Sequence, residues 1–406
     1  MAKTTIENKI AITMCPASYG DSFFVQFPNE QINILIDAGF ISTYNLHLKP
    51  KLQELDKQGN ALDLLVVTHI DADHISGVIQ LLEENVSNEQ ANVISIKNIW
   101  HNSYRHIQTQ QENHSSLQPP SRKNENAIKR LNALGYPLMT EEKQKSISAQ
   151  QGSSLASLIK KGGYNWNIHF NEKAVAIENQ SIIQLTDNIK LILLSPNLQK
   201  LSNLKKYWLS ELRKLGHIGK DDADLFYDDA FEFSLSREKE GVKSQNKISS
   251  TNFDIDLLSK KVFEEDTSVT NGSSISFILE YDNRKVLFLG DSHPSIIEES
   301  LKKIYSEEVI WFDAIKVSHH GSKNNTSPSL LALIDSDCYF ISTNSNKFEH
   351  PDFETLVRII NRPTNKLRNL VFNYQHHAYH AFNNHDLMII YQYNVLIADE
   401  MEEYVF

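Results

Sequence analysis

Short apolar runs alternate with polar turns along the first hundred positions of the chain. KIAITMCP and SFFVQFP are rich in β-formers and are joined by a tight SYGDS turn, and NILIDAG predicts a third strand that ends at Asp37. The stretch LHLKPKLQELDKQG predicts a helix, LDLLVV a buried strand, SGVIQLLEENV a helix and VISIKNIWHN a further strand. This order predicts sheet layers that are covered by helices.

The last part of the chain continues in the same way. YNWNIHF and IKLILLSP predict strands, and SSISFILEY and KVLFLGDS predict a hairpin around a DNR turn. Helical patterns in PSIIEESLKKIYS, SPSLLALI and FETLVRIIN alternate with the predicted strands AIKVSHHGS, CYFISTN, LVFNYQ and LMIIYQYNVL.

Two polar stretches interrupt this pattern, at about 107–163 and about 198–271. The first is interrupted by prolines. The second opens with the basic helix LKKYWLSELRKLG and continues through the acidic DDADLFYDDAFEF. We interpret both as insertions into one domain that spans residues 1–406.

Composition narrows the class of protein. The 406 residues are 40% hydrophobic and 22% charged, which is typical of a globular protein, and the net charge of −11 argues against an indiscriminate nucleic-acid coat but not against a local basic groove. Cys15 and Cys338 are the only cysteines, so we expect no disulfide framework and no cysteine zinc site. The N-terminus lacks the apolar core of a signal peptide, and no apolar run approaches the roughly 20 residues of a membrane span. We therefore expect a cytoplasmic protein.

The strongest chemical signal follows the strand LDLLVV, where HIDADH places His69, Asp71, Asp73 and His74 within six positions. Imidazole and carboxylate groups suit Zn²⁺, Mn²⁺ or Fe²⁺. The alternative is a solvated loop whose aspartates cap the next helix. Four potential ligands directly after a buried strand favour the metal site.

Three other predicted strands also end in acidic or imidazole side chains. KVLFLGDSH delivers Asp291 with His293 nearby, AIKVSHHGS delivers His319 and His320, and NILIDAG delivers Asp37. Each of these alone is typical of a turn or of a packed histidine. Together they favour one site at the edge where rigid strands end.

The motifs THIDADH, FLGDS and KVSHHGS, in this order, resemble those of metallo-β-lactamase-fold hydrolases. Within that superfamily the resemblance is to the hydrolase domain of ComEC-type DNA-uptake proteins and their stand-alone relatives, through the aspartate Asp71, the HHGS motif, GDSFFVQF, and a later Asn346 followed by His350-Pro351. The resemblance covers most of the chain outside the two insertions. It implies an α+β fold, a four-layer αββα sandwich.

The resemblance also implies two divalent metal ions, Zn²⁺ or Mn²⁺. His69 and Asp71 would hold one metal, Asp73 and His74 the other, and Asp291 would bridge them. His320 would be a further metal ligand. The resemblance implies three catalytic residues, Asp73, His319 and His350. His319 would contact substrate phosphate or donate a proton. His350 would lie behind the metal ligands or face the substrate.

One departure from the superfamily pattern concerns the strand before the bridging aspartate. Many members carry another histidine ligand there, whereas LILLSPN has none from Ser195 to Asn197. His101 could substitute if its strand passes the site, or it could be a packed structural histidine. The carboxylate-rich set makes Mn²⁺ a rival to Zn²⁺.

Two segments have open interpretations. In the second insertion, basic side chains flank Tyr207 and Trp208, which could grip a single strand or could pack an amphipathic helix onto the fold. These side chains are Lys200, Lys205, Lys206, Arg213 and Lys214. The C-terminal FNYQHHAYHAFNNH could line a pocket near His350 or form a solvated loop.

The motifs and the resemblance lead to three alternative hypotheses for the function. The first is a metal-dependent phosphodiesterase or nuclease, with single-stranded DNA or another nucleic acid as substrate. The second is a hydrolase of another ester or of a lactone, because one fold hosts many chemistries. The third is an effector subunit that a protein partner regulates, in an anti-phage defence system or an uptake system.

Overall fold

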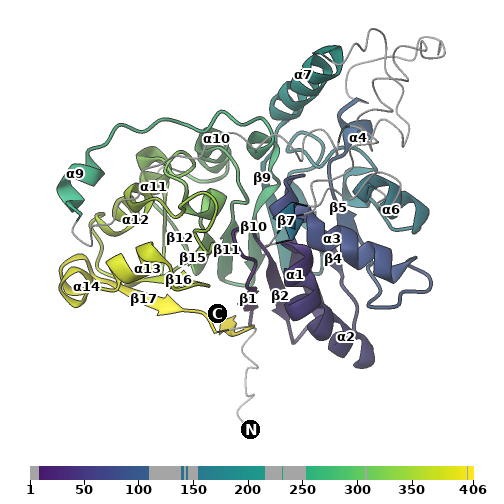
Figure 1. Cartoon of the computed structure of the whole chain (residues 1–406), viewed down its shortest axis with the longest axis horizontal. Coiled ribbons are helices and arrows are strands. Elements are labelled where there is room, and N and C mark those ends of the chain that lie inside the picture. Colours follow the sequence, from purple (N-terminus) through teal and green to yellow (C-terminus); the bar gives the residue numbers. More distant parts are fainter. Residues whose placement is uncertain are drawn as a thin grey trace.

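The computed structural model describes residues 9–108, 139–140, 143–144, 154–214, 231, 253–306, 309–399 and 401–406. Two large sheets lie face to face at the centre of the molecule, and helices cover both outer surfaces (Figure 1). The α+β fold, with its αββα order of layers, is therefore confirmed.

The first sheet has six strands in the order β18-β1-β2-β3-β4-β5. Neighbours from β18 to β3 are antiparallel, whereas β3, β4 and β5 run parallel. The strands are β1 (Ala11–Met14), β2 (Phe23–Phe27), β3 (Ile32–Ile36), β4 (Leu64–Val66), β5 (Ile99–Trp100) and β18 (Glu403–Val405).

The second sheet has eight strands in the order β17-β16-β15-β13-β11-β10-β9-β8. The half from β11 to β17 is parallel, and the half from β8 to β11 is antiparallel. The strands are β8 (Ile182–Gln184), β9 (Ile189–Ser195), β10 (Ser276–Tyr281), β11 (Arg284–Phe288), β13 (Ala314–Lys316), β15 (Cys338–Ile341), β16 (Arg368–Phe372) and β17 (Tyr393–Ile397). Two small sheets pair β12 (Ile310–Phe312) with β14 (Ile334–Ser336) and β6 (Met139–Thr140) with β7 (Lys143–Gln144).

Strands covered on both faces explain why FFVQF and SFILEY read as almost continuous apolar runs. Side chains alternate between the two faces of a strand, so Phe23 and Val25 point into the core between the sheets while Phe24 packs under the helices. In β10, Phe277 joins the core between the sheets and Ile278 joins the core under the other helical layer. Three apolar cores therefore separate four layers.

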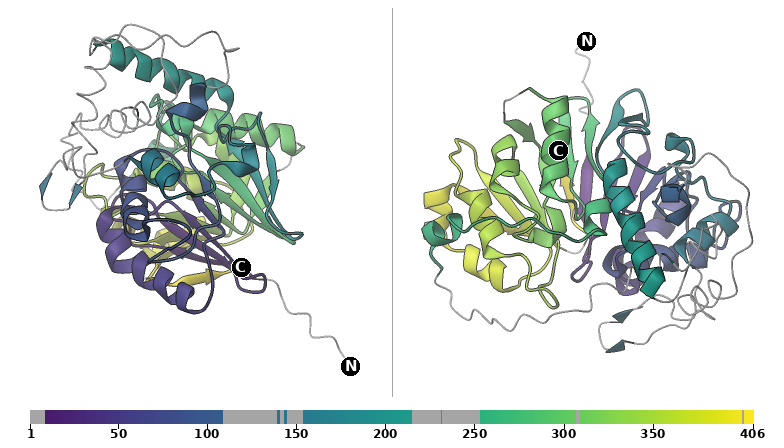
Figure 2. Two further views of the ribbon diagram at one scale, coloured as in Figure 1. Left: turned by 90° about the vertical axis from the view of Figure 1, so that its right-hand side faces the viewer. Right: turned by 90° about the horizontal axis from the view of Figure 1, so that it is seen from above.

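The two helical layers lie on opposite outer sides (Figure 2). The first sheet is covered by α1 (Ile41–Thr43), the π-helical turn η1 (Tyr44–Leu48), α2 (Lys49–Lys57), α3 (Ala72–Asn85), α4 (Tyr104–Gln108), α6 (Leu155–Lys161) and α7 (Leu198–Lys214). The second sheet carries α9 (Ile255–Ser259), α10 (Pro294–Ile304), α11 (Pro328–Leu333), α12 (Phe353–Ile360), α13 (His377–Phe382) and α14 (His385–Tyr391). Three short 3₁₀ turns are η2 (Ile168–Phe170), η3 (Asn271–Ser273) and η4 (Ser318–Gly321).

One of the predicted strands is wrong, and a second forms a strand only in its C-terminal half. YNWNIHF forms the turn η2, because Asn167 and Asn171 adopt left-handed conformations at its two ends and the Asn167 side chain bonds to neighbouring backbone carbonyls. LMIIYQYNVL is divided between α14 and β17. The Asn384 side chain caps α14, and Gln392, with a φ of 53°, turns the chain into the strand.

Most of the two predicted insertions lies outside the described residues, and the division into one domain with insertions stays a prediction. Their described ends pack onto the fold: Leu155 and Ile159 of α6 and Leu201 and Leu204 of α7 join the core under the first helical layer. Across the described ranges, no helix combines the length and the apolar character needed to cross a bilayer. A cytoplasmic location stays a prediction.

Candidate metal centre

The polar strand ends of both sheets meet at one place. His69 follows β4 of the first sheet, whereas Asp291 follows β11 and His320 follows β13 of the second. Parallel strands deliver their carboxyl ends to the same edge, and the amide of Ile275 joins the two sheets there by donating to the Thr68 carbonyl at 2.9 Å. Residues about 220 positions apart in sequence thus come into contact.

The carboxylate of Asp291 lies at the centre of this cluster. Its Oδ2 atom is 3.7 Å from Nε2 of His69 and 3.7 Å from Nε2 of His74. It is also 3.6 Å from Nε2 of His319 and 3.8 Å from Nε2 of His320. A carboxylate with imidazoles on both sides has the position of a ligand that two metal ions could share.

The two aspartates of the HIDADH motif lie beside different histidines of the cluster. Asp71 is 3.2 Å from Nε2 of His69, and Asp73 is 3.6 Å from Nε2 of His320. Asp73 and His74 stand in the first turn of α3, which begins at Ala72, one turn earlier than the apolar pattern predicts. The structure thus brings together the seven histidines and aspartates of the motifs THIDADH, FLGDS and KVSHHGS. The sequence suggests these side chains as metal ligands or phosphate contacts.

A second set of contacts orients His74. Its Nδ1 donates to Oδ2 of Asp37 at 2.7 Å, and Asp37 also accepts hydrogen bonds from the backbone amide of Thr68 at 2.8 Å and from its hydroxyl at 2.6 Å. This arrangement leaves Nε2 of His74 facing Asp291. A carboxylate behind a histidine is the usual way in which proteins orient an imidazole metal ligand.

The turn η4 presents His319 and His320 in a backbone conformation that non-glycine residues rarely adopt. Their φ angles are 47° and 55°, and Gly321 follows at 86°. Nδ1 of His320 donates a hydrogen bond to the Ser342 carbonyl at 2.9 Å, so Nε2 presents its lone pair to the cluster. Strain of this kind persists only where tertiary contacts impose it, and it is common at functional sites.

The sequence did not identify Asp21 and Lys316, which lie beside the cluster. Lys316 forms an ion pair with Asp21, donates to the Gly290 carbonyl at 2.9 Å and lies 3.8 Å from Oδ1 of Asp291. One ligand atom each of Asp21, His74, Asp291 and His320 lies within 4.8 Å of the others. The GDS of the first turn was the only signal: Gly20 is required because a Cβ there would be 2.0 Å from the carbonyl oxygen of Asp73.

A third missed residue, Asp266, reaches the cluster from the second polar stretch. Asn325 donates through Nδ2 to Asp266 at 3.0 Å and to the Asp291 carbonyl at 3.1 Å, so its Oδ1 faces Nδ1 of His319 at 2.8 Å. His319 therefore donates through Nδ1 and directs Nε2 towards Asp291. Nothing in the local sequence EEDTSV indicates this role.

The buried polar atoms of the cluster fit a metal ion. Nε2 of His69, His74 and His320 and both carboxylate oxygens of Asp291 are buried and have no hydrogen-bond partner among the described residues. Buried groups of this kind are usually satisfied, so these atoms are left for a ligand that accepts both imidazole and carboxylate donors.

Charge leads to the same conclusion. Burial would lower the pKa of His74, but the carboxylates of Asp37 and Asp291 outweigh it and raise the pKa to about 10. Burial would raise the pKa of Asp291, yet the surrounding imidazoles hold it well below its usual range. The carboxylates therefore favour positive charge in the cluster, which a divalent cation would supply.

The other candidate residues lie at different distances from the cluster. The His350 ring is 5.3 Å from that of His319, and its Nδ1 is 3.4 Å from Asp352, so it stands at the rim. His101 stacks on Trp166 with ring centroids 6.0 Å apart and is not one of the four residues grouped within 4.8 Å, which supports the packing alternative. Ser195, at the end of β9, pairs with Ser276.

The structure also shows where the basic helix of the second insertion and the C-terminal histidine-rich segment lie. Trp208 is fully buried against Tyr104 and Phe231, so the packing alternative holds for this ring. Lys200 points to His293, with 2.8 Å between Nζ and Nδ1. The C-terminal histidines belong largely to α13, where His376 caps the helix, and they form neither a strand nor a simple loop.

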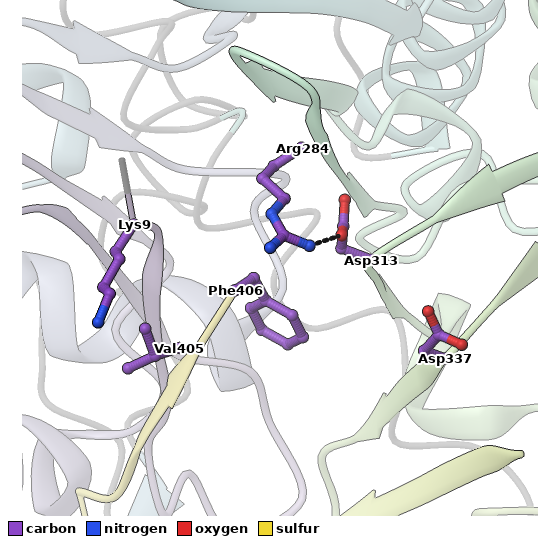
Figure 3. A pocket seen from close by; sticks show the side chains of 6 residues that line it. All are labelled: Lys9, Arg284, Asp313, Asp337, Val405 and Phe406. Atoms are coloured by element: carbon purple, nitrogen blue, oxygen red, sulfur yellow. Dashed lines mark hydrogen bonds and ion pairs between the residues drawn. The ribbon is translucent and has the colours of Figure 1, made fainter. Parts of the chain in front are cut away.

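A separate cavity of about 340 Å³ shares no residue with the cluster (Figure 3). Arg284 and Asp313 form a 2.8 Å ion pair in its wall. The cavity is lined by Lys9, Arg284, Asp313, Asp337, Val405 and Phe406. It carries none of the histidines that the metal chemistry requires.

Comparison with known proteins agrees with the fold. A sequence profile described as the metallo-beta-lactamase superfamily matches residues 15–125, a span that includes Asp21, Asp37 and the complete HIDADH motif. No curated protein gives a significant match to the chain.

Proposed function

We propose that this chain hydrolyses phosphodiester bonds at a two-metal site, because residues 15–125 match the profile of the metallo-beta-lactamase superfamily, which suggests a metal-dependent hydrolase. The observation that carries the proposal is the position of Asp291, whose Oδ2 lies 3.6–3.8 Å from four imidazole nitrogens that come from two sheets. Paired metal ions suit phosphoester hydrolysis, because they supply a hydroxide nucleophile and neutralise charge on the attacking and leaving oxygens.

The proposed ligands are those that the three motifs suggest, and the distances between them support this assignment. His69 and Asp71 would hold one ion, and Asp73, His74 and His320 the other, with Asp291 shared between them. Carboxylates make up half of this set, which supports Mn²⁺ as well as Zn²⁺.

The remaining side chains would act around these ligands. Asp37 orients His74, and Asn325 orients His319. The His319 side chain is 15% exposed whereas that of His320 is 2% exposed, so His319 is the better placed of the two to meet a substrate phosphate. His350 lies beside His319 and would extend the same substrate-facing surface.

The test uses single-stranded DNA, double-stranded DNA, RNA and a generic phosphodiester reporter, each with Mn²⁺, Zn²⁺ or chelator. Asp73→Ala combined with His74→Ala should abolish both turnover and metal content measured by mass spectrometry. The matched control is His385→Ala with Asp386→Ala, which removes an adjacent histidine–aspartate pair from the exposed surface of α14. Cleavage that survives the first double substitution would reject the metal site.

Turnover of a lactone or thioester, without cleavage of any phosphodiester, would instead favour the alternative ester hydrolase. Regulation by a protein partner in a defence or uptake system is a further proposal. The acidic stretch DDADLFYDDAFEF that could serve it lies almost wholly outside the described residues. Activity that appears only when a partner is added would support that role.

A further inference from the structure

Aromatic rings and a lysine form a rim that extends outward from the metal centre. Tyr19 belongs to the turn between β1 and β2, and Lys347, Phe348 and His350 belong to the loop after β15. We call these four residues the aromatic rim. The Phe348 ring contacts Tyr19 at 5.9 Å and His350 at 6.1 Å between centroids.

The aromatic rim is continuous with the proposed catalytic surface. His350 contacts the ring of His319 at 5.3 Å, and Nε2 of His319 is 3.6 Å from Asp291. Two ring contacts therefore connect Phe348 to the metal cluster. A group bound on the rim would adjoin a phosphate bound at the metals.

A positive charge accompanies the rings. Nζ of Lys347 lies 5.3 Å from the Tyr19 centroid and 5.0 Å from the Phe348 centroid, and the lysine is exposed. Both rings are partly exposed, unlike Phe40 beneath Tyr19, which is buried. Partly exposed rings beside a cation are the combination that holds single-stranded nucleic acid by base stacking and phosphate attraction.

The backbone of the rim is held in place by tertiary contacts. Ser18, Ser345 and Glu349 all adopt positive φ angles, between 57° and 63°. Asn344 donates to the Ser18 hydroxyl at 2.7 Å, which ties the two loops together. Gly20 packs directly on the Asp73 carbonyl, so the turn that carries Tyr19 is fixed to the metal-binding loop. A rim built in this way is preorganised for a ligand.

We propose that the aromatic rim binds an unpaired nucleobase next to the phosphodiester that the metal centre cleaves, with Lys347 on an adjoining phosphate. This inference rests on the proposed function and specifies its substrate as single-stranded nucleic acid. Trp208, the aromatic residue that the sequence suggests for this task, is buried in the core.

The experiment compares an oligonucleotide with an abasic oligonucleotide of the same length, each as DNA and as RNA. The wild-type chain should prefer the base-containing strand in kcat/KM and, with chelator present, in affinity measured by fluorescence anisotropy. Tyr19→Leu and Phe348→Leu keep apolar volume but remove the ring, and each should reduce the preference by about tenfold. Tyr19→Phe and Phe348→Tyr keep a ring and should retain it.

Lys347→Ala should weaken binding of both strands and reduce its dependence on salt. Its matched control is Lys366→Ala. Lys366 also lies over an aromatic ring, 3.8 Å from the centroid of Trp311, but that ring belongs to β12 of a small sheet and not to the aromatic rim. Lys366→Ala should leave the binding of both strands and its dependence on salt unchanged.

The outcomes separate the two proposals. Equal cleavage and equal binding of base-containing and abasic strands by the wild type would overturn the proposed role of the aromatic rim. That result would leave the proposed phosphodiesterase activity unaffected. A base preference in anisotropy that both leucine variants lose would support the rim even if no strand is cleaved, and the absence of cleavage would then count against the proposed function alone. DNA and RNA arms that differ would identify the preferred strand.

Discussion

Replacement of Lys316 by methionine tests the charge balance of the metal centre. The side chain is 3% exposed, pairs with Asp21 and lies 3.8 Å from Oδ1 of Asp291. Methionine keeps an unbranched chain only one atom shorter and removes the charge. Two buried carboxylates then lose their nearest ammonium group, and Asp21 keeps only a longer contact, 3.4 Å from its Oδ1 to Nδ1 of His320, among the described residues. Loss of one partner of a buried ion pair costs about 3–5 kcal/mol, and we expect Lys316→Met to destabilise the metal-free protein by that amount.

The measurement is urea unfolding in the presence of chelator, with stability taken from the midpoint and slope. Asp21→Asn together with Lys316→Met should recover part of the loss, because the carboxylate that needs the lysine is also gone. The double-mutant cycle should show coupling of about 2 kcal/mol. Added Mn²⁺ should reduce the cost of Lys316→Met, since it would restore positive charge near Asp291.

Lys285→Met is the control, because Lys285 is 35% exposed on β11 and is 3.9 Å from Glu280. An exposed pair of this kind contributes at most about 1 kcal/mol. If Lys316→Met costs no more than Lys285→Met, or if the two substitutions in the cycle are additive, the account of a required buried charge is refuted.

Three further predictions concern positions around and away from the site. Asp266→Asn should lower kcat/KM by roughly tenfold with metal content unchanged, because it loosens the support of His319; equal kinetics for variant and wild type would contradict this. Burial, together with the neighbouring histidines, lowers the pKa of His376 to about 3, so the unfolded chain binds one more proton between about pH 3 and 6.5 and stability rises with pH in that window. His376→Asn should therefore reduce that slope by up to about 1.4 kcal/mol per pH unit in urea unfolding measured across the window, and an unchanged slope would rule the explanation out. Trp208→Ala should cost about 3–5 kcal/mol in the same assay, since the ring is fully buried, while the folded variant should bind oligonucleotides as the wild type does.

Local pattern was sufficient for most elements and for the candidate ligands. Strands buried on both faces appear as apolar runs whatever their neighbours are, and a strand that ends in HIDADH, GD or HH places its polar groups at the sheet edge by the direction of the chain alone. The same reasoning failed for YNWNIHF. Its aromatic residues favour a strand, but Trp166 and Phe170 are buried in two different cores and the intervening backbone is turned by Asn167.

Only the tertiary structure could add Asp21, Lys316 and Asp266 to the centre. A buried lysine at the end of a strand has no local signature, and an aspartate in a turn is most often a turn residue. Their roles depend on partners 25 to nearly 300 positions away in the chain, which are brought within 4 Å by strand pairing, loop packing and, for Asp21 and Lys316, the packing of two sheets. The sequence determined which groups could bind a metal, and the packing decided which charges surround them, because electrostatic contacts depend on distance in space and not along the chain.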